Sequence, residues 1–215
     1  MNSERQYSGL LFTMIGPAGA GKNAVMNGVL EQHAEARQFP TATTRARRDY
    51  ETQGREHQFL SRAEFEAMIA QQALLEHQEV HGNWYGIPRH PLENALAHGA
   101  LLFADIDMHG ATIVRQAFPH NAILVFVAPP SLPVLAQRMR ERGESEAEIS
   151  RRLLRAPAEM TYAPQCDYII INDTLKQSIA EMMEIVAWER KRQNAHLRFR
   201  QSLVAEAASA HETLS

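Results

Sequence analysis

The segment GPAGAGKN, from Gly16 to Asn23, has the residue types and spacing of a phosphate-binding loop. Its glycines let the backbone turn tightly and aim successive N–H groups at one point, and a following helix adds the positive end of its dipole. Lys22 would reach the outer phosphates of a nucleotide and follow the charge as it moves in phosphoryl transfer. A glycine-rich turn that only connects a strand to a helix is the alternative. The motif predicts nucleotide binding by Gly16, Pro17, Ala18, Gly19, Ala20, Gly21, Lys22 and Asn23.

Oxygen ligands for a magnesium ion are expected close to this loop. The residue after the loop lysine is usually Ser or Thr, whose hydroxyl coordinates Mg²⁺, and here it is Asn23, whose amide oxygen can act directly or through water. The run LLFADID places Asp105 and Asp107 on the same face at the end of a predicted strand. We expect Asp105 to serve the metal, whereas Asp107 could instead cap a following helix.

A second phosphate site is suggested by the segment TTRARRDYE. Arg45 and Arg48 stand three residues apart, and Glu51 follows three residues later. Guanidinium groups suit a bidentate grip on a phosphate monoester. The alternative is a basic cluster on a solvated loop, and the arginines alone do not decide between the two.

The elements that must position these residues alternate between buried strands and helices. Short apolar runs with abrupt ends predict strands at 10–15, 101–107, 122–130 and 167–173, and the last is too continuously apolar to be half-exposed. Helical patterns cover 22–36, 61–71, 132–142, 146–159 and 175–190. This alternation predicts an α/β fold with a parallel sheet covered by helices on both faces.

Two segments interrupt the predicted core. Residues 38–91 are polar and arginine-rich, which indicates an insert. Residues 138–159 carry several arginines on two helical segments joined by RGES, which indicates a lid. The segment 191–215 is polar and alanine-rich, and we expect a helical or flexible tail whose role the sequence does not reveal.

Composition bounds the class of protein. The 215 residues are 45% apolar and 22% charged with a formal net charge of −3, which fits one globular domain and argues against nucleic acid as a partner. Cys166 is the single cysteine, so no intrachain disulfide can form and a reducing compartment is expected. No apolar stretch approaches 18 residues, and we expect a cytoplasmic protein without a membrane partner. The oligomeric state cannot be inferred.

Six blocks, in order, resemble the guanylate kinases. The most informative is EHQEVHGNWYGIP, from Glu76 to Pro88, which resembles their acceptor-binding segment. The others are TTRARR, LFADIDMHGA, VFVAPPSLPVLAQRMRERG, RRLLRAPAEM and DYIIIND, and together the blocks cover about residues 8–185. The resemblance implies a guanylate kinase-like domain at 8–190. Its P-loop NTPase-type core would comprise 8–37, 92–137 and 160–190, with an acceptor-binding insert at 38–91 and a lid at about 138–159.

The same resemblance implies roles for individual residues. Arg45, Arg48 and Tyr85 would hold the acceptor's phosphate, and Glu76 would accept hydrogen bonds from both N1–H and the exocyclic amine of guanine. Two lid arginines would neutralise charge on the transferring phosphoryl group. The residues implied for the acceptor site are Thr41, Arg45, Arg48, Glu51, His57, Glu76, Tyr85 and Asp107. Those implied for catalysis are Lys22, Arg45, Arg138 and Arg152, with Arg142 a weaker candidate.

Several positions depart from the family pattern. His57 replaces a tyrosine, Ile87 replaces a Ser or Thr that contacts the base, and Tyr50 replaces a glycine. Of these departures, His57 and Ile87, together with Asn23, look like the ribose 1,5-bisphosphate phosphokinases, which share the fold. Glu76 and the Asp-Ile-Asp run look like guanylate kinase instead.

Three functional hypotheses follow. The first is an enzyme that transfers a phosphoryl group from ATP to GMP with Mg²⁺, and the second is a kinase of the same fold acting on ribose 1,5-bisphosphate. The third is a binding module that has lost catalysis. Such modules typically lack the loop lysine, whereas Gly21 and Lys22 are present here.

Overall fold

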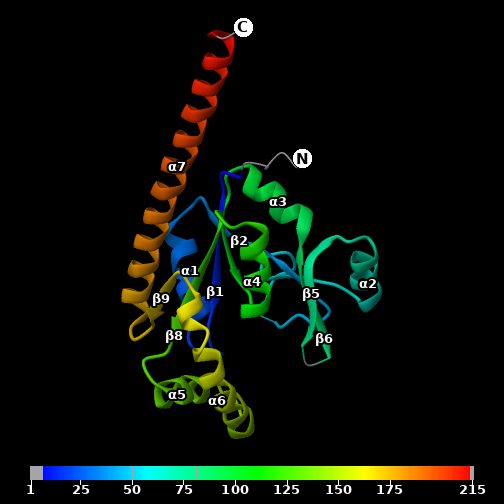
Figure 1. The fold of residues 1–215 in the computed structure, drawn as a ribbon. Helices are drawn as coiled ribbons and strands as arrows, with labels where there is room; N and C mark the ends of the chain where they lie inside the picture. Colours follow the sequence, from blue (N-terminus) through cyan, green and yellow to red (C-terminus); the bar gives the residue numbers. More distant parts are fainter. Residues whose placement is uncertain (1–6, 50, 81, 214–215) are drawn as a thin grey trace.

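The structure is a computed structural model that describes residues 7–49, 51–80 and 82–213, and its centre is a five-stranded sheet (Figure 1). The strand order is β2-β7-β1-β8-β9, and every pairing in this sheet is parallel. The predicted α/β fold with a parallel sheet is therefore confirmed. The strands are β1 Leu10–Ile15, β2 Ala36–Gln38, β7 Leu101–Asp105, β8 Ala122–Ala128 and β9 Tyr168–Ile171.

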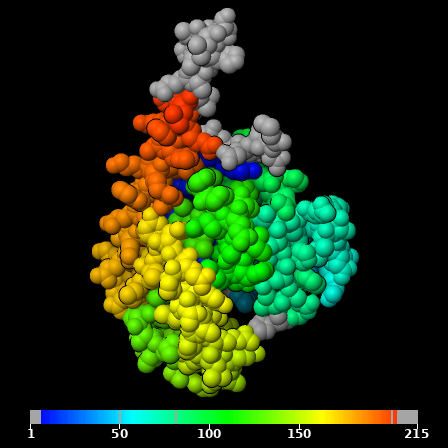
Figure 2. Space-filling model, viewed as in Figure 1, coloured from blue at the N-terminus to red at the C-terminus, as the bar shows by residue number. Residues whose placement is uncertain are grey.

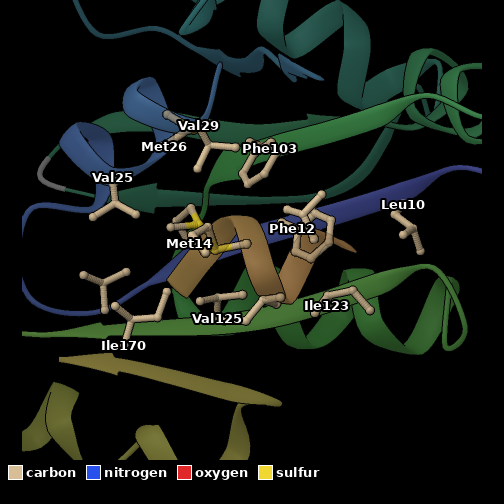
Figure 3. Packing of buried hydrophobic residues seen from close by; sticks show 14 of the residues in the cluster. Leu10, Phe12, Met14, Val25, Met26, Val29, Phe103, Ile123, Val125 and Ile170 are labelled. Carbon is tan, nitrogen blue, oxygen red and sulfur yellow. The ribbon is translucent and has the colours of Figure 1, made fainter. Parts of the chain in front are cut away.

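Helices cover both faces of this sheet because alternate strand residues point to opposite sides. Leu10, Phe12 and Met14 of β1 pack with α1 and α7 in one hydrophobic cluster, which Figure 3 shows from close by. Leu11 packs on the other face with residues of α3 and α4. The helices are α1 Lys22–Gln32, α2 Arg62–Ala70, α3 Arg89–Ala97, α4 Met108–Ala117, α5 Leu132–Glu141, α6 Glu146–Met160 and α7 Leu175–Thr213, with a 3₁₀ turn at Ala163–Gln165.

The insert forms a second sheet beside the core (Figure 1). Its strand order is β4-β3-β6-β5, with parallel pairing only between β3 and β4. Helix α2 begins at a capping box formed by Ser61 and Glu64, and Phe65 fills the space between this helix and the sheet. The strands are β3 Thr41–Thr43, β4 His57–Phe59, β5 Leu74–Val80 and β6 Asn83–Pro88.

Helices α5 and α6 form a separate layer at the carboxyl end of the core strands, where the predicted lid lies (Figure 1). They pack on each other through a small cluster that includes Leu135, Met139 and Ile149. Met139 and Leu135 also lie against Gly19 of the phosphate loop. The described chain contains no helix that is both long and apolar enough to cross a membrane.

The helix predicted at 22–36 is wrong at its C-terminal end. Helix α1 ends at Gln32, and Ala36–Gln38 instead form strand β2, which pairs with β7 at the edge of the sheet. Alanine and arginine favour helices, but this local preference is weak and the pairing with β7 overrides it.

The prediction that 167–173 form a fully buried strand is also wrong. Strand β9 is the other edge of the core sheet, and only Ile170 is buried, within the cluster that includes α7. Ile169 is exposed, and Ile171 is 62% exposed. A continuous apolar run cannot distinguish an edge strand covered on one face from a central strand covered on both.

Candidate active site

The phosphate loop lies between β1 and α1, as its motif requires. Gly16, Gly19 and Gly21 adopt φ values of 135°, 91° and 97°, which side chains disfavour. A Cβ at Gly16 would also clash with the carbonyl oxygen of Val127 on β8. The glycines are thus needed both for the turn and for the close approach of the neighbouring strand.

Lys22 is the first residue of α1, and its side chain folds back over the loop. Its Nζ donates to the carbonyl oxygen of Gly16 at 2.8 Å and lies 3.8 Å from Oδ1 of Asp105. The ammonium group is therefore held where the loop and the end of β7 meet. A nucleotide phosphate entering here would compete with the loop carbonyl oxygens and the carboxylate that already hold the lysine.

Asn172 supports the loop from the far side, and the sequence analysis missed it. The residue follows β9 and is buried; its Nδ2 donates to the carbonyl oxygen of Ala20 at 2.7 Å. Ser178 on α7 donates to its Oδ1 at 3.0 Å. A polar residue directly after an apolar run in DYIIIND was the only signal available, and it does not reveal a partner about 150 residues away.

Asp105 and Asp107 lie where β7 leads into α4. Asp107 is the N-cap of α4, accepting from the backbone N–H of Gly110 at 2.8 Å, and it also accepts a hydrogen bond from Gln78 of the insert. The capping alternative considered for Asp107 is therefore present in the structure. Asp105 is half-exposed beside Lys22.

Two cavities meet at these aspartates. One has a volume of about 340 Å³ and is lined by the loop, Lys22 and the start of α4; the other, of about 300 Å³, is lined by the insert. Asp105, Ile106 and Asp107 line both. Figure 2 shows a hollow on this side of the molecule, between α4 and α6 and the insert. The second cavity includes Thr41, Arg45, Arg48, His57, Glu76, Tyr85, Ile87 and Asp107.

Glu51 lies behind the cavity's arginines and is not one of the residues that line it. Its carboxylate accepts hydrogen bonds from Nη2 and Nη1 of Arg45, at 2.7 and 3.0 Å, and from the backbone N–H of Arg48 at 2.8 Å. Burial alone would raise the pKa of Glu51, but these hydrogen bonds lower it below its ordinary value. The bond to Glu51 in turn raises the pKa of Arg45. Glu51 thus orients the arginines.

Glu76 is the one acid of β5 that is almost fully enclosed, at 9% exposure. The pairing of β5 with β6 shifts register between Leu74 and His77, so Glu76 sits at a bulge. Burial raises the pKa of Glu76 to about 7, and the charge of Asp107 adds to the shift. Within the described residues, its Oε2 is buried and has no hydrogen-bond partner. A buried acceptor of this kind is suited to a ligand that donates hydrogen bonds.

The rest of this cavity is lined by Thr41, His57, Tyr85 and Ile87, among others. The hydroxyl of Thr41 lies 2.7 Å from Nδ1 of His57, and the histidine ring meets Tyr85 edge-on. Burial, reinforced by the charge of Arg45, lowers the pKa of His57, so the ring is neutral at pH 7. Ile87 is fully buried and offers no hydroxyl.

Comparison with known proteins identifies the family of the chain. A family model described as guanylate kinase matches residues 9–189. The chain belongs to the guanylate kinase family. It is 39% identical over 186 residues to a guanylate kinase of Bordetella pertussis, with 86% of each chain covered. It is 40% identical over 190 residues to one of Ralstonia nicotianae, which covers 88% of this chain and 86% of the relative.

A solved structure gives the same result. The crystal structure of guanylate kinase from Anaplasma phagocytophilum superposes with a TM-score of 0.68 at 27% identity, covering 87% of this chain and 89% of that one. The resemblance to guanylate kinases inferred from the sequence is therefore confirmed. The matched range ends at residue 189, so most of α7 lies beyond the guanylate kinase domain.

The arginines of the predicted lid are not brought to the two cavities. Arg138 donates to the carbonyl oxygen of Asp173 at 3.0 Å, and Arg152 is paired with Glu148 at 2.7 Å. Arg142 is exposed at the end of α5. Asn23 is exposed on the first turn of α1 and lines neither cavity, and Tyr50 lies outside the described residues.

The donor set at the loop fits a magnesium ion that arrives with a nucleotide. Within the described residues no group of three or more His, Cys, Asp and Glu is placed to hold a metal by itself. Mg²⁺ in kinases is commonly held by one or two carboxylates together with phosphates and water. The half-exposed carboxylate of Asp105, which lines the loop cavity beside Lys22, meets that requirement.

Proposed function

We propose that this chain transfers the γ-phosphoryl group of ATP to GMP, yielding ADP and GDP. The observation that carries the proposal is the pair of adjoining cavities, one at a phosphate loop with its lysine and the other containing a buried carboxylate and two arginines. Membership of the guanylate kinase family supports the same reaction. In the reaction, an oxygen of the GMP phosphate attacks the γ-phosphorus, and the bond from that phosphorus to ADP breaks.

Glu76 is proposed to recognise the base. Guanine presents two parallel donors, N1–H and the exocyclic amine, which match one carboxylate, whereas adenine offers no such edge. The unpartnered Oε2 and the buried position make this carboxylate costly until a ligand donates to it. Gly110 gives it room, since a Cβ there would come within 3.0 Å of Oε1.

The acceptor phosphate is proposed to bind Arg45, Arg48, Tyr85 and His57. Glu51 holds the Arg45 guanidinium in place, which lowers the conformational entropy lost when a phosphate binds. When the hydroxyl of Thr41 donates a hydrogen bond to Nδ1 of His57, the neutral ring carries its hydrogen on Nε2 and can donate a hydrogen bond from there. His57 would then replace the phenol that the family pattern has at this position.

Lys22 is proposed to carry the transfer step. Its ammonium group would exchange the carbonyl oxygens of the loop for the outer phosphates and stabilise the charge that moves between them. Mg²⁺ bound with ATP, held by Asp105 and Asn23, would neutralise further phosphate charge. Arg138 and Arg152 are proposed to reach the phosphates only when α5 and α6 close, because their present partners hold them elsewhere.

A kinase for ribose 1,5-bisphosphate remains the second candidate. It is favoured by His57 and by the buried, hydroxyl-free Ile87 in the cavity lined by the insert, here called the acceptor cavity. A coupled assay with ATP, Mg²⁺ and purified protein should be run with GMP, AMP, CMP, UMP and ribose 1,5-bisphosphate. We expect turnover of GMP above every other acceptor. Turnover of ribose 1,5-bisphosphate without turnover of GMP would select the second candidate. A cytoplasmic location stays a prediction that rests on the single cysteine and on the lack of a long apolar stretch in the sequence.

A further inference from the structure

Helix α7 is much longer than the surface it covers. Its 39 residues span about 58 Å at 1.5 Å per residue. Its first half is tied to the core by Met182, by a hydrogen bond from Tyr168 to Glu189, and by Gln193, which donates to the carbonyl oxygen of Tyr7 at 3.0 Å. The rings of His196 and His120 stack at 5.3 Å. Beyond this contact the helix runs away from the body, at the end of the molecule opposite the lid (Figure 1).

The outer face of α7 exposes large apolar side chains. Trp188 is 60% exposed and Phe199 is 65% exposed. Eleven residues make almost three full turns, so Trp188 and Phe199 lie on the same side of the helix. A projecting helix is marginal in water on its own, and most helical stability comes from packing an apolar face. We therefore expect another surface to pack against this face of the helix.

Charge along the same face indicates which occupant. Four exposed charged residues share this side of the helix with Trp188, because successive members are three, four, three and seven residues apart. In order along the helix, the five residues are Glu181, Glu184, Trp188, Lys191 and Arg198. The acids precede Trp188 and the bases follow it. Under a two-fold axis, an antiparallel crossing near Trp188 sets the acidic half of each helix against the basic half of the other.

We propose that the outer face of α7 is an interface between two copies of this chain, crossing antiparallel with Trp188 at its centre. A parallel crossing would place Glu181 and Glu184 opposite the same acids of the second copy. An anionic surface such as a membrane or a nucleic acid would attract the basic half but be repelled by the acidic half. A second copy matches both halves at once.

The first test is the mass of the full-length protein in solution, measured by sedimentation at several concentrations and salt levels. We expect a reversible dimer of about 48 kDa, twice the 24.2 kDa of one chain, that weakens at high salt. Trp188→Glu should weaken dimerisation at least tenfold. Leu154→Glu, at an exposed position on α6, is the matched control and should leave the dimer intact. A wild-type protein that stays monomeric, or a dimer that Trp188→Glu does not weaken, would overturn the proposal.

The second test is charge reversal, which checks the antiparallel orientation. The variant Glu181→Lys/Glu184→Lys should lose dimerisation, since basic residues would then face basic residues. Adding Lys191→Glu/Arg198→Glu should restore it by inverting both halves. Turnover of GMP by every variant should stay at the wild-type level, because the outer face of α7 lies away from both cavities, and this verifies folding. If the variant that carries all four substitutions remains monomeric, the antiparallel arrangement is contradicted.

Discussion

The two halves of the active site are built by different means. The phosphate loop is made of backbone, fixed by glycines with positive φ and by Asn172, which holds the carbonyl oxygen of Ala20. The acceptor cavity is made of charged and polar side chains, in which Glu51 orients Arg45 and burial raises the pKa of Glu76. The first half therefore depends on chain geometry and the second on electrostatics. Substitutions and pH should affect the two halves in different ways.

The largest expected effect comes from the loop half. Lys22→Ala should lower kcat by on the order of 10²–10³-fold, because the lysine acts on charge that develops during transfer. GMP binding, measured by calorimetry without ATP, should stay within about twofold of wild type, since Lys22 does not line the acceptor cavity. A large loss of GMP affinity in this variant would show that the two halves are not separable.

Glu51→Gln tests how far the acceptor half depends on one buried carboxylate. Loss of the charge-assisted grip on Arg45 should raise the KM for GMP about tenfold while kcat changes little, as expected for an interaction worth about 1.4 kcal/mol. Glu56→Gln, at another acid of the insert that pairs with Arg55, is the matched control and should leave KM unchanged. Steady-state kinetics decide between a change in KM and a change in kcat.

The pH dependence of GMP binding should come from Glu76. Its pKa of about 7 means that the carboxylate is increasingly protonated below pH 7, and a protonated acid cannot accept from both guanine donors. Affinity for GMP should therefore fall by up to about tenfold per pH unit below 7. The acceptor phosphate also titrates, near pH 6, so Glu76→Gln serves as the control that retains only that contribution. Equal pH profiles for both proteins would remove Glu76 from the binding step.

The raised pKa of Glu76 should also make the stability of the folded protein depend on pH. The pKa of Glu76 is raised in the folded protein from about 4.5 to about 7, so burying the ionised form destabilises the fold above pH 7 and this cost disappears as pH falls toward 4.5. Glu76→Gln should raise stability by up to about 3 kcal/mol at pH 8 and by almost nothing at pH 4.5. Thermal melts at the two pH values measure this. A lower melting temperature for the variant at pH 8 would be inconsistent with a costly buried charge.

The same contrast explains what the sequence could predict. The phosphate loop is one contiguous segment whose glycines and lysine each have a local reason, and four core strands followed from apolar runs. In the acceptor site, the spacing of Arg45 and Arg48 only suggested a phosphate site, and the roles of the individual residues came from the resemblance to a family. Their arrangement depends on a bulge in β5 and on pairing between β3 and β6, neither of which has a local signature.

The misses have the same physical origin. Asn172 binds a loop that is distant in the sequence. Glu51 is hydrogen-bonded to Arg45 and does not line the cavity. Ile171 lies on an edge strand of the core sheet. Each outcome was decided by a partner that lies far along the chain or outside the local pattern. Sequence periodicity reports what one segment prefers, and tertiary contacts decide which face of it is covered.

In the proposed reaction, the carboxylate of Glu76 recognises the guanine base of the acceptor. Calorimetry at pH 8 with GMP and with AMP, for wild type and for Glu76→Gln, tests it directly. We predict that wild type prefers GMP by at least 10²-fold, on the order of two charge-assisted hydrogen bonds, and that the preference collapses in the variant while AMP affinity is unchanged. An undiminished preference for GMP in Glu76→Gln would contradict the account.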